Sequence, residues 1–144
     1  MKKLILALVC FALVHSARSA DKKSEALIKS HQGVWKPIAA SLNGQRLPKE
    51  ELDKITVTIQ GDNYLVTVEG EDHDDKGTFT VDTGVKPHTM TIKSHEGPNK
   101  GKTFLAIFEH KHSDAMRVCY DLSGKEFPKE FRTKKGSSYY VVGY

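Results

Sequence analysis

The chain has 144 residues, with 22 basic and 18 acidic side chains and a formal net charge of +4 at pH 7. This length suits one domain, which can bury roughly two-thirds of the surface exposed by its unfolded chain. Three basic residues and no acidic residue lie in the first 19 positions, so the remainder carries 19 basic and 18 acidic side chains. This balance is too even for charge-driven binding to nucleic acid or an anionic membrane.

The first residues have the three-part layout of a secretory signal peptide. Lys2 and Lys3 precede an apolar run over residues 4–14, and small residues lead to Ser19. Eleven apolar residues are too few for a membrane span, which needs about 20. We therefore predict a leader over residues 1–19, one domain over residues 20–144, and a secreted or periplasmic protein that does not insert into a membrane after cleavage.

Two short helices and eight strands follow in chain order. Residues 22–32 predict a short helix stopped at Gly33, and residues 48–54 predict one or two helical turns that begin at Pro48. Alternation of apolar and polar residues predicts strands over residues 34–42, 55–59, 64–68, 77–82, 88–93, 103–109, 115–121 and 138–143. This pattern favours an all-β fold with an eight-stranded antiparallel barrel, because closure leaves no exposed sheet edge. A β-sandwich is the competing architecture.

One face of the successive predicted strands is apolar and bulky. It comprises Val57, Val66, Phe79, Met90, Phe104, Phe108, Met116, Val118 and Tyr120. An eight-stranded barrel is just wide enough to be filled by side chains or to hold one small ligand. The number of large aromatic residues favours a largely filled interior, with a ligand cavity as the alternative.

The segment from Gly97 to Thr103 resembles a nucleotide-phosphate loop at first sight. However, three residues rather than four separate Gly97 from Gly101, and the next residues predict a strand where a phosphate loop leads into a helix. We therefore interpret this segment as a turn between two strands.

Two groups of residues could be considered as metal ligands. His110 and His112 are two residues apart, but no third ligand accompanies them, and we expect residues 110–114 to form a solvated hairpin loop. Residues 72–75 offer oxygen ligands without the glycine and the distant glutamate of a calcium loop, so a hydrated turn is expected there. We predict no metal and no cofactor.

Cys119 is the one cysteine outside the predicted leader. Alternation places it on the opposite face from Met116, Val118 and Tyr120, which predicts an inert packed thiol, with an intermolecular disulfide as the alternative. The chain has no Gly-x-Ser-x-Gly elbow or comparable nucleophile motif. We therefore predict that the protein is not an enzyme.

A short helix followed by Gly33, Val34 and Trp35 resembles the start of lipocalins. Together with "DKGTFTVD", "GPNKGKTFLAIFE" and "MRVCYDLSGKEFPKEF", this segment is similar to a lipocalin-like domain family of unknown function that is abundant in planctomycete-type bacteria. The resemblance covers residues 33–131 and implies an exported lipocalin-like barrel in which Trp35 plugs the closed end. Lipocalins cover this tryptophan with a late arginine, and here no arginine follows Arg132.

These observations predict a non-catalytic binding module for a small apolar or amphipathic ligand. The candidate barrel-lining residues are Phe79, Phe104, Phe108, Met116 and Tyr120. The alternative is a structural or protein-interaction domain of the cell envelope with a filled barrel. An enzyme would require polar residues gathered in a pocket, for example around His110, His112 or Cys119.

Overall fold

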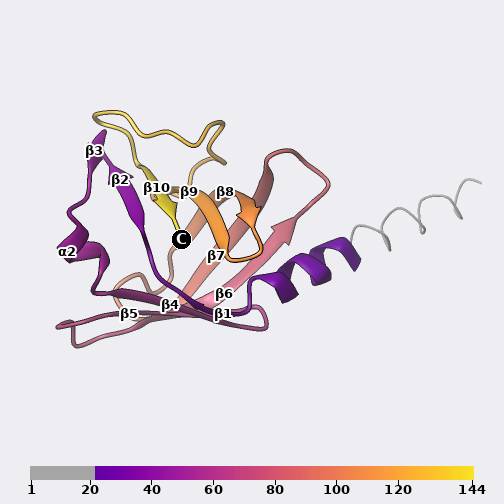
Figure 1. The fold of residues 1–144 in the computed structure, drawn as a ribbon, viewed down its shortest axis with the longest axis horizontal. Helices are drawn as coiled ribbons and strands as arrows, with labels where there is room; N and C mark the ends of the chain where they lie inside the picture. Colours follow the sequence, from indigo (N-terminus) through magenta and orange to yellow (C-terminus); the bar gives the residue numbers. More distant parts are fainter. Residues whose placement is uncertain (1–21) are drawn as a thin grey trace, which may run out of the picture.

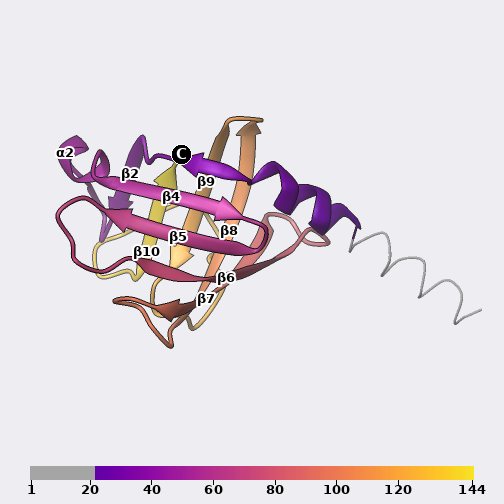
Figure 2. The ribbon, with the colours of Figure 1, turned by 90° about the horizontal axis from the view of Figure 1, so that it is seen from below.

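The computed structural model describes residues 22–144, so the predicted leader over residues 1–19 lies outside the described residues. The fold is all-β: one antiparallel sheet with the strand order β1-β4-β5-β6-β7-β8-β9-β10-β2-β3 curls into a half-barrel (Figure 1). Seen from below, β4, β5 and β6 run side by side, and β8, β9 and β10 cross behind them (Figure 2). Side chains on the inner face of this curled sheet therefore converge from several strands.

The sheet has ten strands and the described chain has two short helices. The strands are β1 (Gly33–Trp35), β2 (Ala39–Leu42), β3 (Gln45–Arg46), β4 (Ile55–Gln60), β5 (Asn63–Val68), β6 (Asp75–Asp82), β7 (His88–Glu96), β8 (Thr103–His112), β9 (Ala115–Asp121) and β10 (Tyr139–Gly143). One helix covers residues 22–30, and α2 (Lys49–Leu52) precedes β4. Pro48 is the N-cap of α2 rather than its first helical residue.

The prediction of eight strands is wrong, because the first predicted strand is interrupted. Pro37 has no backbone N–H and cannot continue a ladder. β1 therefore pairs with β4, whereas β2 pairs with β10, and Ile38 N donates to Gly143 O at 2.8 Å. Beyond β2, Asn43 and Gly44 both have positive φ, as a two-residue hairpin turn requires, and lead into the two-residue strand β3.

The other seven predicted strands are present as β4 to β10. Cross-strand pairing brings Val57 opposite Val66 and Phe108 opposite Val118, so the alternation in the sequence does define the inner face. The segment after β7 is a turn, in which Lys100 N donates to Gly97 O at 3.1 Å, and strand β8 follows it. The geometry of a phosphate loop followed by a helix is thus absent from residues 97–112.

The helix over residues 22–30 packs against one end of the core. Leu27 and Ile28 contact the buried cluster that contains Trp35, Phe79 and Phe108. Trp35 Nε1 donates to the carbonyl oxygen of His31, the residue just after the helix, at 2.7 Å. This bond links the end of the helix to β1, and the helix covers that end of the half-barrel.

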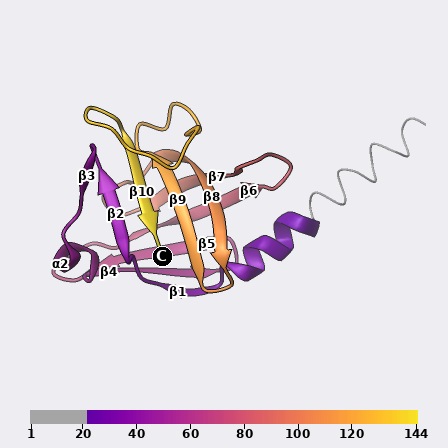
Figure 3. The same cartoon turned by 45° about the horizontal axis from the view of Figure 1, so that its top comes forward.

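The segment over residues 122–138 lies against the outer face of β9. Asp121 accepts hydrogen bonds from the backbone nitrogens of Lys125 and Glu126, both at 3.0 Å. The Arg117 guanidinium carbon lies 4.2 Å from the centroid of the Phe131 ring. Figure 3 shows this segment joining β9 to β10. It buries outward-facing side chains of β8 and β9, including Cys119, which is completely buried.

Candidate functional site: an apolar cavity in the curled sheet

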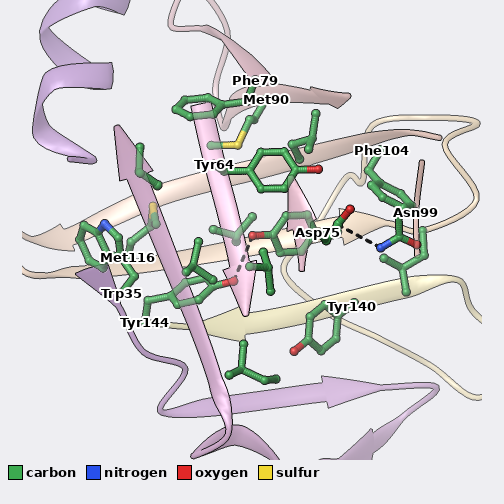
Figure 4. A pocket seen from close by; sticks show the side chains of 18 of the residues that line it. Trp35, Tyr64, Asp75, Phe79, Met90, Asn99, Phe104, Met116, Tyr140 and Tyr144 are labelled. Atoms are coloured by element: carbon green, nitrogen blue, oxygen red, sulfur yellow. Dashed lines mark hydrogen bonds between the residues drawn. The ribbon is translucent and has the colours of Figure 1, made fainter. Parts of the chain in front are cut away.

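A cavity of about 520 Å³ lies within the curled sheet (Figure 4). At the end closed by the helix its walls are Trp35, Phe79 and Met116, which are 8%, 3% and 5% exposed. At the other end they include Lys102 and Leu122, which are exposed. The cavity is therefore closed on the helix side and reaches the protein surface on the opposite side.

The cavity corrects the expectation of a largely filled interior. The bulky aromatic residues Trp35, Phe79 and Phe108 gather in the core at the closed end, rather than filling the middle. The wall formed by β4 and β5 is mainly aliphatic, and Val57 and Val66 face each other at its middle. Small side chains on the middle of this wall leave the volume that aromatic side chains would otherwise occupy.

Four of the five predicted lining residues surround this cavity. Phe79, Phe104, Met116 and Tyr120 contribute to its walls from β6, β8 and β9. Phe108 lies outside the lining: it is completely buried, and its ring centroid is 5.2 Å from that of His31 and 5.6 Å from that of His88. Phe108 therefore belongs to the core around the closed end of the cavity and does not line the cavity itself.

A polar group interrupts the apolar wall near the mouth. Asp75 accepts a hydrogen bond from Ser94 Oγ at 2.5 Å and another from Asn99 Nδ2 at 3.1 Å. Tyr64 also lines the cavity, and its hydroxyl oxygen is buried without a hydrogen-bond partner. Burial raises the pKa of Tyr64, an effect that the nearby Ser94 hydroxyl opposes and the Asp75 carboxylate reinforces. The Tyr64 hydroxyl is therefore protonated at neutral pH, and it makes no hydrogen bond within the described residues.

A second pair of phenols lies deeper in the cavity. The hydroxyl oxygens of Tyr120 and Tyr144 are 3.2 Å apart. Burial raises the pKa of Tyr120 to about 12 and raises that of Tyr144 well above its usual range. Both phenols are therefore protonated at neutral pH, and since one hydrogen lies between the two oxygens, the other is left to donate elsewhere.

His31 and His110 meet at the closed end, which corrects the expectation that His110 lies in a solvated loop. β8 continues to His112, and His110 pairs with the inward-facing Met116. His112 is exposed, and a bulge separates it from His110 in the ladder, so the two predicted neighbours are not a ligand pair. Within residues 22–144, no three His, Cys, Asp or Glu side chains gather as a metal-binding group.

Cys119 and Asp121 lie on the outer face of β9, away from the cavity. Burial raises the pKa of Cys119 to about 11. Burial alone would also raise the pKa of Asp121, but hydrogen bonds from Ser138, Ser123 and the Glu126 backbone nitrogen hold it well below its usual range. Asp121 holds the segment over residues 122–138 in place, Cys119 is buried beneath it, and neither side chain lines the cavity.

The sequence-based site omitted the polar part of the lining. Tyr64 alternates with Val66 on the same strand, so its inward direction could have been inferred from the same pattern. The sequence pattern predicts a hydrated turn at Asp75, whereas this residue begins β6, and the pattern indicates only a turn at Asn99. Asp75 and Asn99 lie together because the turn after β7 folds back onto β6, and no local sequence pattern predicts this contact.

Comparisons with known proteins add no identification. No protein-family model, no curated protein and no solved structure matches the chain. The resemblance carried by Gly33, Trp35 and the later segments stays a prediction. Neither helix within residues 22–144 combines the length and the apolar character needed to cross a membrane.

Proposed function

We propose that the protein is an exported lipocalin-like binding module that holds a small apolar or amphipathic molecule in its cavity without transforming it. The observation that carries this proposal is the cavity of about 520 Å³, apolar at its closed end and open at the other. Small-molecule sites in proteins are typically concave, about 300–1,000 Å³ in volume, and mostly apolar with a few placed polar groups. The cavity has these features.

The arrangement of β1 and β2 supports the lipocalin-like part of the proposal. The strands β4 to β10 form a row of seven neighbours in the sheet. β1 pairs with β4 at one end of this row, and β2 pairs with β10 at the other end. If β1 and β2 are taken as one strand broken at Pro37, and the two-residue β3 is omitted, eight strands surround the cavity. Gly33 and Trp35 stand at the closed end, as the family resemblance implies.

Export is proposed from the pattern of residues 1–19. Lys2 and Lys3, the apolar run and the small residues before Asp21 support a cleaved leader and a secreted or periplasmic protein. Fractionation of cells that produce the full chain, with the intact mass of the recovered protein, tests this point. Recovery of the uncleaved chain in the cytoplasm would contradict it.

A protein-interaction role would use the outer surface instead. Val34 and Ile38 are the most exposed large apolar residues among those described, at 67% and 72%. Single exposed apolar residues are common on soluble proteins and do not by themselves mark an interface. The cavity therefore supports small-molecule binding more strongly.

The binding proposal can be tested through Trp35, the single tryptophan of the chain and a residue of the cavity wall. Purified protein is titrated with a fatty acid, an isoprenoid and haem while tryptophan fluorescence is followed, and native mass spectrometry is used to find co-purified ligands. Saturable changes, or a bound mass, are expected. No change with any probe and no bound mass would contradict the proposal.

A matched pair of variants locates the binding. Val66 lines the cavity, whereas its neighbour Thr67 alternates to the other face of β5. Val66→Phe should fill the cavity and weaken binding at least about tenfold, whereas Thr67→Phe should leave affinity within about twofold. Equal effects of the two variants would place the ligand elsewhere.

A further inference from the structure

Two hydroxyl hydrogens inside the cavity have no acceptor in hydrogen-bond geometry among the described residues. The Tyr64 hydroxyl is buried and unpaired, and the Tyr120–Tyr144 pair retains one hydrogen that the bond between the two oxygens does not use. The Asp75 carboxylate accepts hydrogen bonds from Ser94 and Asn99, and neither Asp75 nor Ser94 is in hydrogen-bond geometry with the Tyr64 hydroxyl. A buried donor without an acceptor destabilises the fold. The Tyr64 hydroxyl would therefore gain from a ligand atom that accepts its hydrogen.

The charges around these donors restrict what that acceptor can be. Asp75 is the one carboxylate among the lining residues of the described chain, and it would repel an anionic head group placed at Tyr64. The one lysine of the lining, Lys102, is exposed at the mouth, with its Nζ 3.5 Å from Asn99 Oδ1. A buried carboxylate ligand would thus lack a paired cation, which is costly. An ammonium head group could pair with Asp75, but it has no lone pair to accept the Tyr64 hydrogen.

We propose that the cavity selects neutral lipophilic molecules that carry a carbonyl oxygen, and that the Tyr64 hydroxyl donates to this oxygen. The apolar body lies toward Trp35, Phe79 and Met116, and the oxygen lies in the region of Tyr64, Tyr120 and Tyr144. Figure 4 shows the Tyr64 hydroxyl directed toward the side of the cavity where Asp75 and Asn99 lie, and the Tyr144 hydroxyl directed toward its hydrogen-bond partner. This inference rests on the proposed binding function and specifies the class of ligand.

The experiment uses four compounds that share one aromatic body and differ in the head group. They are 2-acetylnaphthalene, 2-naphthoate, 2-naphthylmethylamine and 2-ethylnaphthalene, and their affinities are measured by isothermal titration calorimetry at pH 7.5. The ketone is expected to bind at least about tenfold more tightly than the anion. Tyr64→Phe is expected to weaken ketone binding about 5- to 50-fold and to change 2-ethylnaphthalene binding by less than about twofold.

Two controls separate a ligand contact from a structural effect. Tyr139→Phe removes a phenol whose hydroxyl donates to Glu126 Oε1 at 3.0 Å, outside the cavity, and it should leave all four affinities unchanged. Tyr64→Phe removes an unpaired buried hydroxyl, so the melting temperature should stay the same or rise. A large fall in the melting temperature would show that this hydroxyl is structurally engaged and would overturn the proposal.

The outcomes distinguish the two levels of the proposal. The preference for a neutral carbonyl is wrong if 2-naphthoate or the amine binds as tightly as the ketone. It is also wrong if Tyr64→Phe lowers the affinity for 2-ethylnaphthalene as much as the affinity for the ketone. In both cases the binding function stands. If none of the four compounds binds to the wild-type protein and the fluorescence and mass-spectrometry assays are also negative, the binding function is wrong as well.

Discussion

The imidazole rings of His31 and His110 pack edge to face, with centroids 4.6 Å apart and planes inclined at 72°. His31 Nδ1 is 2.6 Å from the carbonyl oxygen of Leu27, and because a carbonyl only accepts, the proton is on Nδ1. The Nε2 atoms of both rings are buried without a hydrogen-bond partner. The helix over residues 22–30 is therefore held on the closed end of the cavity by a neutral, completely buried imidazole.

We predict that the folded state loses stability as pH falls below about 6.5, the pKa of a histidine in an unfolded chain. Burial lowers the pKa of His31, its hydrogen bond to Leu27 opposes this effect, and His110 reinforces it. The unfolded chain then takes up the proton before the folded one does, so the free energy of unfolding decreases from pH 6.5 down to the folded pKa. Urea unfolding at pH 7.5 and pH 5.0 measures the difference.

His31→Phe should reduce this pH dependence, because it removes the group that titrates. His112→Gln serves as its control, since His112 is exposed at the end of β8. The comparison is made between variants, because other groups of the chain also titrate in this range. If His31→Phe and the wild type lose the same stability between pH 7.5 and pH 5.0, the buried imidazole is not responsible.

Asp121 is predicted to be the main anchor of the segment over residues 122–138. It is 1% exposed, and its oxygens accept hydrogen bonds from the Ser123 and Ser138 hydroxyls, both at 2.7 Å, as well as from backbone nitrogens. Asp121→Asn preserves the shape but exchanges one acceptor oxygen for a donor. We expect a loss of about 3 kcal/mol in the free energy of unfolding.

Urea unfolding measures this loss, and limited proteolysis reports on the segment itself. Cleavage within residues 122–138 should become faster in the Asp121 variant before global unfolding occurs. Asp114→Asn, in the exposed turn after β8, should be close to wild type in both assays. An Asp121→Asn protein as stable and as resistant as Asp114→Asn would contradict the anchoring role.

Local patterns predict much of the inner face, because strand alternation is a property of the chain itself. Val57 and Val66 face each other as the pattern requires, and the turn at residues 97–102 follows from its glycines. The break at Pro37 could also have been predicted, since proline rarely continues a strand. The apolar outward residue Ile107, opposite Cys119, was a further sign that something covers this face of the sheet.

The cavity could not be predicted in the same way. Whether an interior is filled depends on which side chains meet across strands that are distant in sequence, and on their summed volumes. The large residues gather at the helix end, while Ala106 and Gly77 occupy inner positions on β8 and β6. The position of the Tyr64 hydroxyl near Asp75 and Ser94, without a hydrogen bond to either, likewise depends on tertiary contacts.

We predict that Gly77 is needed for the close packing of β6 against β5 and β7. A Cβ atom at this position would overlap the carbonyl oxygen of Lys93 and would lie 2.8 Å from the Tyr64 hydroxyl oxygen. Gly77→Ala should therefore lower the free energy of unfolding by about 1–3 kcal/mol, in the range of overpacking. Gly143→Ala is the control, because its Cβ would meet Ile38 Cγ1 at an ordinary 3.8 Å. Equal melting temperatures of the two variants would contradict the prediction.

Cys119 is predicted to be unreactive while the protein is folded. Its side chain is completely buried beneath the segment over residues 122–138, and burial raises its pKa to about 11, so almost no thiolate forms at pH 8.

The protein is incubated with iodoacetamide at pH 8, with and without guanidinium chloride, and the peptide that contains Cys119 is measured by mass spectrometry. We expect at least about 100-fold faster alkylation in denaturant, because both the thiolate fraction and the access of the reagent increase on unfolding. Asp121→Asn should raise the rate in native buffer if loosening of the segment exposes the thiol. Rapid alkylation of the folded wild-type protein, or a disulfide-linked dimer that survives without reductant, would show instead that Cys119 is accessible.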